Sequence, residues 1–330
     1  MHQSAIWLSE DNVASLVTLN DTIAELEKGL RHLGQGKAFN IPKALGSIGP
    51  QASMHSLGSA LTQDGYCGYK NWVNTPQGAK AVFILFHAIE GRLLAILEAN
   101  ALGQMRTSAM TGLGTKWLAP SNAADMAIIG SGRQALAQIA AVNAVRPLKR
   151  LRVWSPTPEK RAAFCNKVRT MFDMEVMDAS SLEQATDSAE IVTTVTRASA
   201  PFFNGNLLAK GAYYNAVGAI LPSNAEFHQD VFDRVGMIAV DDVPSTRKAS
   251  REFIDYFDKG GHDWNLVRPL GDVIANNQHQ LTGGDVTLFK SMGMGISDLS
   301  VATLAYQRAQ EAGLGLSIPL TQNADIRWEK

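Results

Sequence analysis

The sequence contains only two cysteines, Cys67 and Cys165, among its 330 residues. Two cysteines cannot form the set of several disulfides that stabilises small secreted domains. A chain of this length can instead bury a large apolar core, and 45% of its residues are hydrophobic. The sequence therefore predicts a protein stabilised by its core in a reducing compartment, and we expect that compartment to be the cytoplasm.

Long apolar runs are also missing. The longest ones, such as residues 81–86, are far shorter than the roughly 20 residues that a helix needs to cross a bilayer. The first residues, Met1-His2-Gln3-Ser4, lack the basic and apolar regions of a signal peptide. We therefore expect no membrane partner and no secretory signal.

The chain lacks an excess of either charge. Lys and Arg total 30, Asp and Glu total 31, and the formal net charge is −1. No basic cluster suggests a nucleic-acid surface. The 7 histidines are scattered, without the spacings at which zinc sites place His and Cys. The sequence thus predicts no nucleic-acid partner and no metal site.

The sequence does contain two regions that differ in their pattern of strand-forming and helix-forming segments, as expected for a chain long enough to form two domains. In the first region, Asn20 can cap a helix with an apolar stripe. Residues 43–77 are rich in Gly, Ser and Pro and predict short strands joined by loops. A hairpin of strands at 81–86 and 93–97 follows, and then a helix at 105–113.

The second region alternates short apolar runs with helix-forming segments. Residues 126–129 form a continuous apolar run, which is typical of a strand buried on both faces of a parallel sheet. The strands and helices expected after it are 135–145, 151–154, 159–172, 190–195, 213–217 and 237–240, with a final helix at 299–311. This alternation predicts a doubly wound α/β sheet of the Rossmann type.

A glycine motif stands between the first expected strand and helix of this region. Gly130-Ser131-Gly132-Arg133-Gln134-Ala135 matches G-x-G-x-x-G/A with Ala in the last place. Gly130 permits the tight turn, Gly132 lets the backbone approach a pyrophosphate, and Ala135 lets helix and strand pack closely. The helix N-terminus directs positive partial charge at the phosphates. We therefore predict a nicotinamide dinucleotide site at this turn.

The sequence leaves the choice between NAD and NADP open. The residue that accepts from the ribose hydroxyls is normally acidic and lies about 20 residues after the glycines, but this chain has Trp154-Ser155-Pro156-Thr157 there. No Arg stands beside Ser155 to bind a 2′-phosphate, although Lys160 and Arg161 are one turn away. Ser155 either contacts the cofactor or caps the next helix. We slightly favour NAD.

Several motifs resemble the ornithine cyclodeaminase/mu-crystallin family over nearly the full chain. They are Gly68-Tyr69-Lys70-Asn71-Trp72-Val73-Asn74, Arg106-Thr107-Ser108-Ala109, residues 128–135, Asn215-Ala216-Val217-Gly218 and Thr287-Leu288-Phe289-Lys290-Ser291-Met292-Gly293. The resemblance implies a homodimer. It also implies a substrate and dimerisation domain of residues 1–119 plus 298–330, into which a dinucleotide-binding domain of residues 120–297 is inserted.

The resemblance places Lys70 and Arg106 in the catalytic pocket, where they meet the substrate. An amino or imino acid needs a fixed cationic partner, and Arg offers a carboxylate two parallel N–H donors. Lys70 can add a second cation and exchange a proton with the substrate nitrogen. The alternatives are that Arg106 caps a helix or pairs with Glu98, and that Lys70 lies on the surface.

Two departures from the family pattern bear on the substrate. Lys43 stands where the family usually has an Arg, so positive charge is kept but the bidentate geometry is lost. The resemblance implies a second departure at Ile220. Ornithine cyclodeaminases have an Asp at this position, and that Asp binds the distal amine of the substrate. An aliphatic side chain can neither pair with that amine nor act as a base, and this disfavours cyclodeamination of ornithine.

The remaining expected contacts belong to the cofactor. Gly293 lets the backbone approach the nicotinamide, and Thr194 and Thr196 end a strand beside the cleft. The full expected set is Thr107, Gly130, Ser131, Gly132, Arg133, Gln134, Ser155, Thr157, Thr194, Thr196, Val217, Lys290 and Gly293. Asp298 is either a partner behind the substrate ligands or the N-cap of the last helix.

Two further side chains have a structural and a functional interpretation. Cys67 is interpreted as apolar filler rather than a nucleophile, because no His is near it in sequence. His55 either lines the pocket or has a structural role, and we favour the structural role.

Together these features predict an NAD(P)-dependent oxidoreductase acting on the CH–NH2 or C=N group of a small amino or imino acid. Its reaction is that of a ketimine reductase, such as 1-pyrroline-2-carboxylate reductase, or of an L-amino acid dehydrogenase. The alternatives are a lyase that recycles bound NAD and a non-catalytic NAD(P)H or ligand binder of the mu-crystallin type.

Overall fold

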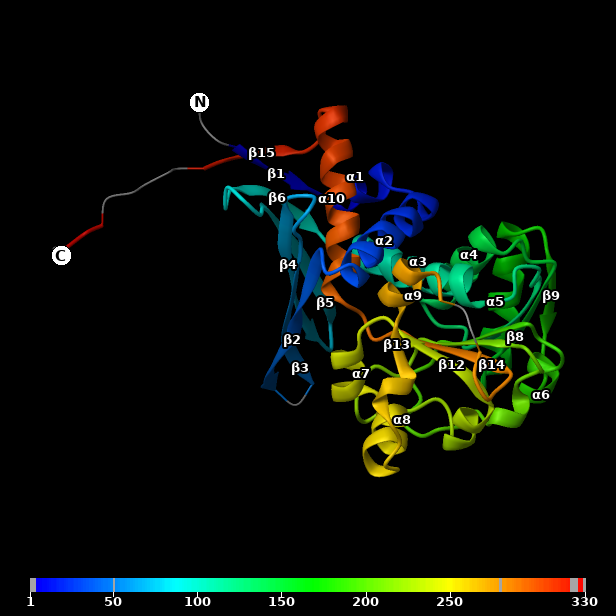
Figure 1. Cartoon of the computed structure of the whole chain (residues 1–330). Helices are drawn as coiled ribbons and strands as arrows, with labels where there is room; N and C mark the ends of the chain where they lie inside the picture. Colours follow the sequence, from blue (N-terminus) through cyan, green and yellow to red (C-terminus); the bar gives the residue numbers. More distant parts are fainter. Residues whose placement is uncertain (1–3, 50, 279–280, 321–325, 329–330) are drawn as a thin grey trace.

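The computed structural model describes residues 4–49, 51–278, 281–320 and 326–328. Residues 1–3, on which the prediction about a signal peptide partly rests, lie outside this part. Two sheets stand side by side, and α3 (Asn100–Leu118) and α10 (Gly295–Ala312) lie between them (Figure 1). The mixed α/β class that the sequence predicts is confirmed.

The first sheet has seven strands in the order β15-β1-β6-β5-β4-β3-β2. Neighbouring strands pair antiparallel except for β1 with β6. The strands are β1 Ser4–Leu8, β2 Ala38–Gly49, β3 Ala52–Leu61, β4 Tyr66–Thr75, β5 Gly78–His87, β6 Leu93–Glu98 and β15 Leu316–Pro319.

The prediction of short strands over residues 43–77 is wrong. The chain forms long strands there, with Gly65, which has a positive φ, in the turn between β3 and β4, and Gly78, also with a positive φ, as the first residue of β5. Pro42 is tolerated inside β2 because the pairing register shifts between Ile41 and Ala44, and proline is confined to such irregularities or to edge strands. Composition alone therefore misled the prediction of strand length.

The second sheet has eight strands in the order β13-β12-β14-β11-β10-β7-β8-β9, all parallel. They are β7 Asp125–Ile129, β8 Arg150–Trp154, β9 Glu175–Asp178, β10 Ile191–Thr194, β11 Tyr213–Ala216, β12 Val235–Val240, β13 Val267–Pro269 and β14 Val286–Lys290. The chain order reverses between β7 and β10, and doubly wound sheets bind ligands at the carboxyl ends of the strands beside such a reversal. The predicted Rossmann-type sheet is confirmed, whereas the exact domain boundaries remain a prediction.

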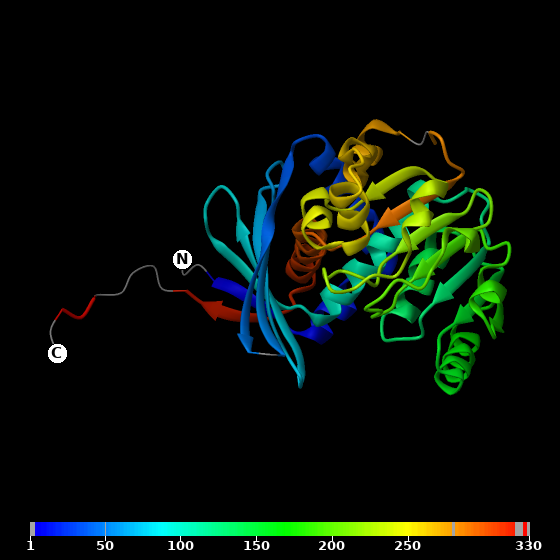
Figure 2. The same cartoon turned by 90° about the horizontal axis from the view of Figure 1, so that it is seen from below.

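Ten α-helices are described. They are α1 Glu10–Leu16, α2 Leu19–Gly34, α3, α4 Ala135–Val145, α5 Pro158–Met171, α6 Leu182–Thr186, α7 Val243–Ala249, α8 Arg251–Phe253, α9 Leu270–Asn276 and α10. Figure 2 shows α10 beside the first sheet, and α7 lies directly against β2. Within the described ranges, no helix combines the length and the apolar character needed to cross a membrane.

The starts of two helices differ from the prediction. Thr18, not Asn20, caps α2: its hydroxyl accepts from the Asp21 N–H at 3.2 Å, and the Asp21 carboxylate accepts from the Thr18 N–H at 3.1 Å. This reciprocal pair satisfies two backbone donors at once. The helix expected at residue 105 begins at Asn100, because the Glu10 carboxylate accepts from the N–H groups of Asn100 and Ala101. No pattern near residue 100 could reveal that distant cap.

Candidate active site

A cleft of about 1290 Å³ opens at the carboxyl ends of β7, β8, β10 and β11 and reaches β4 and α3. Most of the predicted site residues line it. They are Lys70, Arg106, Thr107, Gly130, Ser131, Gly132, Arg133, Gln134, Ser155, Thr157, Thr196, Val217, Ile220 and Gly293. The structure thus brings together residues from both sheets that lie far apart in the sequence.

The glycine turn has the shape that a pyrophosphate needs. Gly130 has φ +119°, and a Cβ there would lie 2.8 Å from the Val195 carbonyl oxygen. A Cβ on Gly132 would meet no atom within 4 Å, so the space beside it is open. The side chain of Gln134 does not cap α4, and its buried Oε1 lacks a partner in the described part of the chain. The helix N-terminus therefore faces open space and can take phosphate oxygens.

The adenosine side of the cleft contains hydroxyls and cations. The Ser131 hydroxyl donates to Ser155 Oγ at 3.0 Å. Thr157 is the N-cap of α5, so the interpretation of Ser155 as the cap is wrong. Arg161 is engaged within the protein, by the Ser155 carbonyl at 2.8 Å and by the Asp178 carboxylate.

The lining of the cleft bears on the choice of cofactor. Of the described residues that line it, none is Asp or Glu, and Arg133 and Lys160 are the cations on the adenosine side. An acid that would accept from the ribose hydroxyls of NAD is therefore missing at the cleft wall. The wall itself leaves NAD and NADP both possible.

Lys70, Arg106 and Asp298 form the charged centre on the opposite wall. Lys70 Nζ lies 3.0 Å from Asp298 Oδ1, and Arg106 Nε lies 3.3 Å from the same oxygen. Asp298 is fully buried, and Met294 rather than Asp298 is the N-cap of α10. Of the two interpretations of Asp298, the helix cap is wrong, and the carboxylate instead pairs with Lys70 and Arg106, whose substrate role stays a prediction. Neither a surface position for Lys70 nor a pair with Glu98 for Arg106 is found.

The surroundings of Lys70 control its charge. Burial lowers the pKa of the Lys70 ammonium, the Asp298 carboxylate opposes this, and the Arg106 guanidinium lowers the pKa further. The Trp72 ring lies 5.5 Å from Nζ. A Cβ on Gly103 would lie 2.7 Å from Nζ, so a side chain there would displace this ammonium. A buried lysine of lowered pKa can give up and regain a proton near neutral pH.

A buried carboxylate that sequence reasoning missed fixes the turn beside Arg106. Asp241, at the end of β12, accepts from the N–H groups of Met292 at 2.9 Å and Gly293 at 2.8 Å, and from the Ser291 hydroxyl at 2.9 Å. Gly293 has φ +86°, and a Cβ there would lie 2.9 Å from Arg106 Nη1. The only sequence signal for Asp241 is its position directly after a strand of the parallel sheet.

Three predicted site residues do not line the cleft. The Thr194 hydroxyl donates to Glu226 at 2.9 Å, and Lys290 is fully buried with Nζ 4.0 Å from Glu252 Oε1. The expectation of cleft contacts fails for both because their side chains turn into the interior. Lys43, on β2, is half-buried; burial lowers its pKa, and the charge of Arg106 lowers it further. It thus lies within electrostatic reach of Arg106, and its substrate role stays a prediction.

The two side chains with double interpretations lie outside the lining of the cleft. His55 stacks on Trp72 with ring centroids 4.6 Å apart and bonds Ser53 Oγ at 2.8 Å, which fits the structural interpretation. Burial raises the pKa of the Cys67 thiol, which disfavours the thiolate that a nucleophile requires. In the described ranges, no group of three or more His, Cys, Asp or Glu could hold a metal.

Comparison with known proteins agrees with this site. Residues 4–313 match the ornithine cyclodeaminase/mu-crystallin family. Delta(1)-pyrroline-2-carboxylate reductase of Bacillus cereus is 31% identical over 230 residues, which are 69% of this chain and 70% of the reductase. Ketimine reductase mu-crystallin of Rattus norvegicus is 28% identical over 320 residues, 93% of this chain and 98% of that protein.

A solved structure extends the likeness to three dimensions. The Thermococcus litoralis Delta(1)-pyrroline-2-carboxylate reductase in complex with NADH and L-proline has a TM-score of 0.87 at 25% identity, covering 95% of this chain and 100% of that one. The sequence motifs, the fold and the family match lead to one assignment. The chain belongs to the ornithine cyclodeaminase/mu-crystallin family.

Proposed function

We propose that this protein is an NAD(P)-dependent oxidoreductase that interconverts a small imino acid and its amino acid, with NADH as the favoured cofactor. One observation carries the proposal: a single buried carboxylate, Asp298, holds the cations of Lys70 and Arg106 across the cleft from the open glycine turn. The first relatives compared are imine reductases by name, and the solved relative binds NADH and L-proline.

In this mechanism the bound cofactor supplies or accepts the hydride at the C=N carbon. Arg106 binds the substrate carboxylate, and Lys43 adds positive charge from β2. The Lys70 ammonium gives a proton to the imine nitrogen, because a protonated imine accepts hydride more readily. These side chains would hold the substrate facing the bound cofactor, and positioning of this kind can contribute on the order of 7–11 kcal/mol to catalysis.

Ile220 argues against the deamination of diamino acids. It lines the cleft with 40% of its surface exposed. The described lining has no Asp or Glu that could pair with a distal ammonium, and an unpaired buried charge is costly. The proposed substrate is therefore a small imino acid without a second cationic group.

A panel assay tests the proposal. Purified protein is mixed with NADH or NADPH and with 1-pyrroline-2-carboxylate, 1-piperideine-2-carboxylate, iminosuccinate or pyruvate plus amine, and absorbance at 340 nm is followed. We expect stoichiometric loss of reduced cofactor with at least one imine. Ammonia release from amino acids without net absorbance change would support the lyase instead. Cofactor binding without turnover of any substrate would support a binding protein.

Replacing Gly132 tests the cofactor site separately from the chemistry. A Cβ at Gly132 meets no protein atom within 4 Å, so Gly132→Val should leave the Tm within about 2 °C of the wild type. The new side chain fills the space of the pyrophosphate, so the Kd for NADH should rise about 100-fold. Fluorescence titration measures the Kd, and Gly49→Val is the comparison for a bulky residue at an open glycine, because Gly49 also has open space and no positive φ but lies outside the cleft. An unchanged Kd would contradict the assignment of this turn.

Replacing Asp298 tests its control of Lys70. The Asp298 carboxylate raises the pKa of Lys70, while burial and Arg106 lower it and Glu10 raises it more weakly. Asp298→Asn removes the negative charge, so the pKa of Lys70 falls and its ammonium is lost at lower pH. The alkaline limb of kcat for imine reduction should then move to lower pH by about one unit or more. Asp64→Asn, at an ion pair with Lys28, should not move the alkaline limb of the pH profile. If Asp298→Asn does not move it either, Asp298 does not control the pKa of Lys70.

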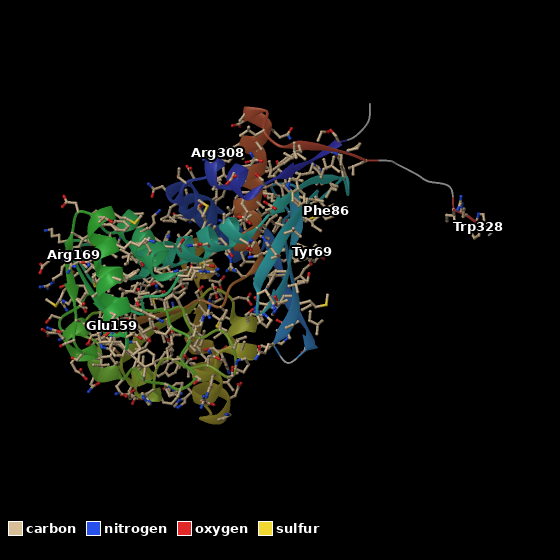
Figure 3. The ribbon with its side chains drawn as sticks, turned by 180° about the vertical axis from the view of Figure 1, so that it is seen from behind. Tyr69, Phe86, Glu159, Arg169, Arg308 and Trp328 are labelled. Atoms are coloured by element: carbon tan, nitrogen blue, oxygen red, sulfur yellow. The ribbon has the colours of Figure 1, made fainter. Side chains whose placement is uncertain are left out.

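A homodimer is proposed on the outer face of the first sheet. Phe39 is 50%, Met54 54%, Tyr69 41% and Val73 42% exposed, and strand register places them on one face. Figure 3 shows Tyr69 and Phe86 on the side of this sheet that faces away from the second sheet. Exposed apolar area of this kind marks interaction sites. Light scattering that gives the mass of one chain would contradict the dimer.

The cytoplasmic location also stays a proposal. It rests on both cysteines being free, because unpaired thiols are typical of reducing compartments. Cell fractionation tests it.

A further inference from the structure

Glu226 is a buried carboxylate directly behind the cleft. It is fully buried, yet it accepts five hydrogen bonds. Oε1 accepts from the Thr196 N–H at 2.7 Å and the Thr196 hydroxyl at 2.8 Å. Oε2 accepts from the Thr194 hydroxyl at 2.9 Å and from the N–H groups of Gly218 at 2.9 Å and Ala219 at 3.3 Å. Hydrogen bonds to both oxygens offset the cost of burying this polar side chain.

These donors come from two separate chain segments. Thr194 and Thr196 lie at and beyond the end of β10, and Gly218 and Ala219 follow β11. Thr196 and Gly218 also line the cleft. A Cβ on Gly218 would lie 2.2 Å from Glu226 Oε1 and 2.4 Å from the Thr196 backbone nitrogen. The two segments therefore press against each other with the carboxylate between them.

We propose that Glu226 is a positioning residue that ties these two segments together and so shapes the half of the cleft that receives the nicotinamide. The glycine turn after β7 takes the pyrophosphate, and the segments after β10 and β11 lie on the other side of the strand reversal, where a doubly wound fold places the second nucleotide. Glu226 touches neither cofactor nor substrate and acts through Thr196 and Gly218. This inference rests on the proposed function.

A second buried carboxylate, Glu252, connects Glu226 to a third strand. Glu252 Oε1 accepts from the Glu226 N–H at 2.9 Å, and Glu252 Oε2 accepts from the Ser250 hydroxyl at 3.0 Å. The buried Lys290 Nζ lies 4.0 Å from Glu252 Oε1. Lys290 ends β14, directly before the turn that carries Gly293. The sequence predicts that Lys290 contacts the cofactor. We assign it instead to the buried group of Glu226 and Glu252 behind the cleft.

The chemistry of the donors makes Glu226→Gln an informative change. Both oxygens of Glu226 accept from a backbone N–H. The NH2 group of a glutamine would therefore face a backbone N–H in either orientation, and two donors cannot bond each other. One of the two segments must move away. The Kd for NADH should rise about 10-fold, and the KM for NADH should rise with it while kcat at saturating NADH stays near the wild-type value.

Glu190→Gln is the matched control. Glu190 Oε2 also accepts from two backbone N–H groups, those of Ala124 at 2.7 Å and Asp125 at 3.1 Å. These lie at the amino ends of the strands, the edge opposite the cleft. Both bonds use the same oxygen, so glutamine can keep its carbonyl oxygen there and retain them. Glu190→Gln therefore controls for the loss of a carboxylate charge and should leave the Kd for NADH unchanged, whereas Glu226→Gln should raise it. Equal Kd values in the two variants would overturn the proposal, because they would leave Glu226 with a purely structural role.

Thr194→Val serves if Glu226→Gln does not fold. It removes one donor to Glu226 without altering the lining of the cleft, and the Kd for NADH should rise about 3-fold. A Kd that stays at the wild-type value would overturn the proposal. Wild-type protein that binds no NADH overturns the proposed function first, so the two failures are distinguishable.

Discussion

Replacing Lys70 with Met should lower kcat for imine reduction about 1000-fold, because general acid catalysis contributes roughly 100- to 10000-fold. Methionine fills a similar buried volume but supplies no proton. Lys70 is not part of the glycine turn, so the Kd for NADH should stay within about 3-fold of the wild-type value. Stopped-flow measurement of NADH oxidation with saturating imine isolates the chemical step from binding.

Two control variants test whether a general loss of charge or a loss of stability could explain this result. Lys80→Met, on the neighbouring strand β5 and exposed, removes the same charge outside the cleft and should leave kcat unchanged. Lys70→Met leaves the buried Asp298 carboxylate with one of its two cationic partners, Arg106, so some loss of stability is expected. The double variant Lys70→Met/Asp298→Asn removes both charges of the Lys70–Asp298 pair, and its kcat should be as low as that of Lys70→Met. A kcat within 10-fold of the wild type in folded Lys70→Met would exclude Lys70 as the proton donor.

The parts of the fold that depend on local sequence could be predicted. The strand, glycine turn and helix at residues 126–145 are adjacent in the chain, and each glycine has a steric reason that is visible in the motif. The predicted start of α2 was wrong by two residues, because Thr18 and Asp21 cap it in place of Asn20. The strands of the first sheet were harder, since one of its faces is exposed and their Gly and Ser residues resemble loops.

The charged centre of the site could only partly be predicted. Lys70 and Asp298 are 228 residues apart, and no local pattern distinguishes a buried ion-pair partner from a helix cap. Asp241 and Glu226 were missed for a related reason: most of their donors are backbone N–H groups, which every residue type except proline supplies. Thr194 was placed correctly at a strand end, but strand alternation turns its side chain inward. Side-chain direction at the end of a strand needs the register, which a single sequence does not contain.

Arg106→Lys should lower kcat/KM for an imino acid about 100-fold, mainly through KM. The planar guanidinium can donate two parallel bonds to a carboxylate, whereas an ammonium acts as a single point of charge. A bond to a charged group contributes about 1.5–3 kcal/mol, and roughly 2.7 kcal/mol corresponds to 100-fold. Arg92→Lys, on a surface pair with Glu90, should have no effect on these kinetics.

A substrate without a carboxylate separates this role from general disruption of the site. With 1-pyrroline in place of 1-pyrroline-2-carboxylate, the wild-type protein has no carboxylate for Arg106 to bind. The ratio of wild-type to Arg106→Lys activity should therefore shrink from about 100 to nearly 1 with this substrate, as in a double-mutant cycle. Because Gly293 packs against the Arg106 guanidinium and Asp241 fixes that turn, damage to the turn would lower both activities equally. An equal loss with the two substrates would assign Arg106 to the support of the cleft and remove it from substrate recognition.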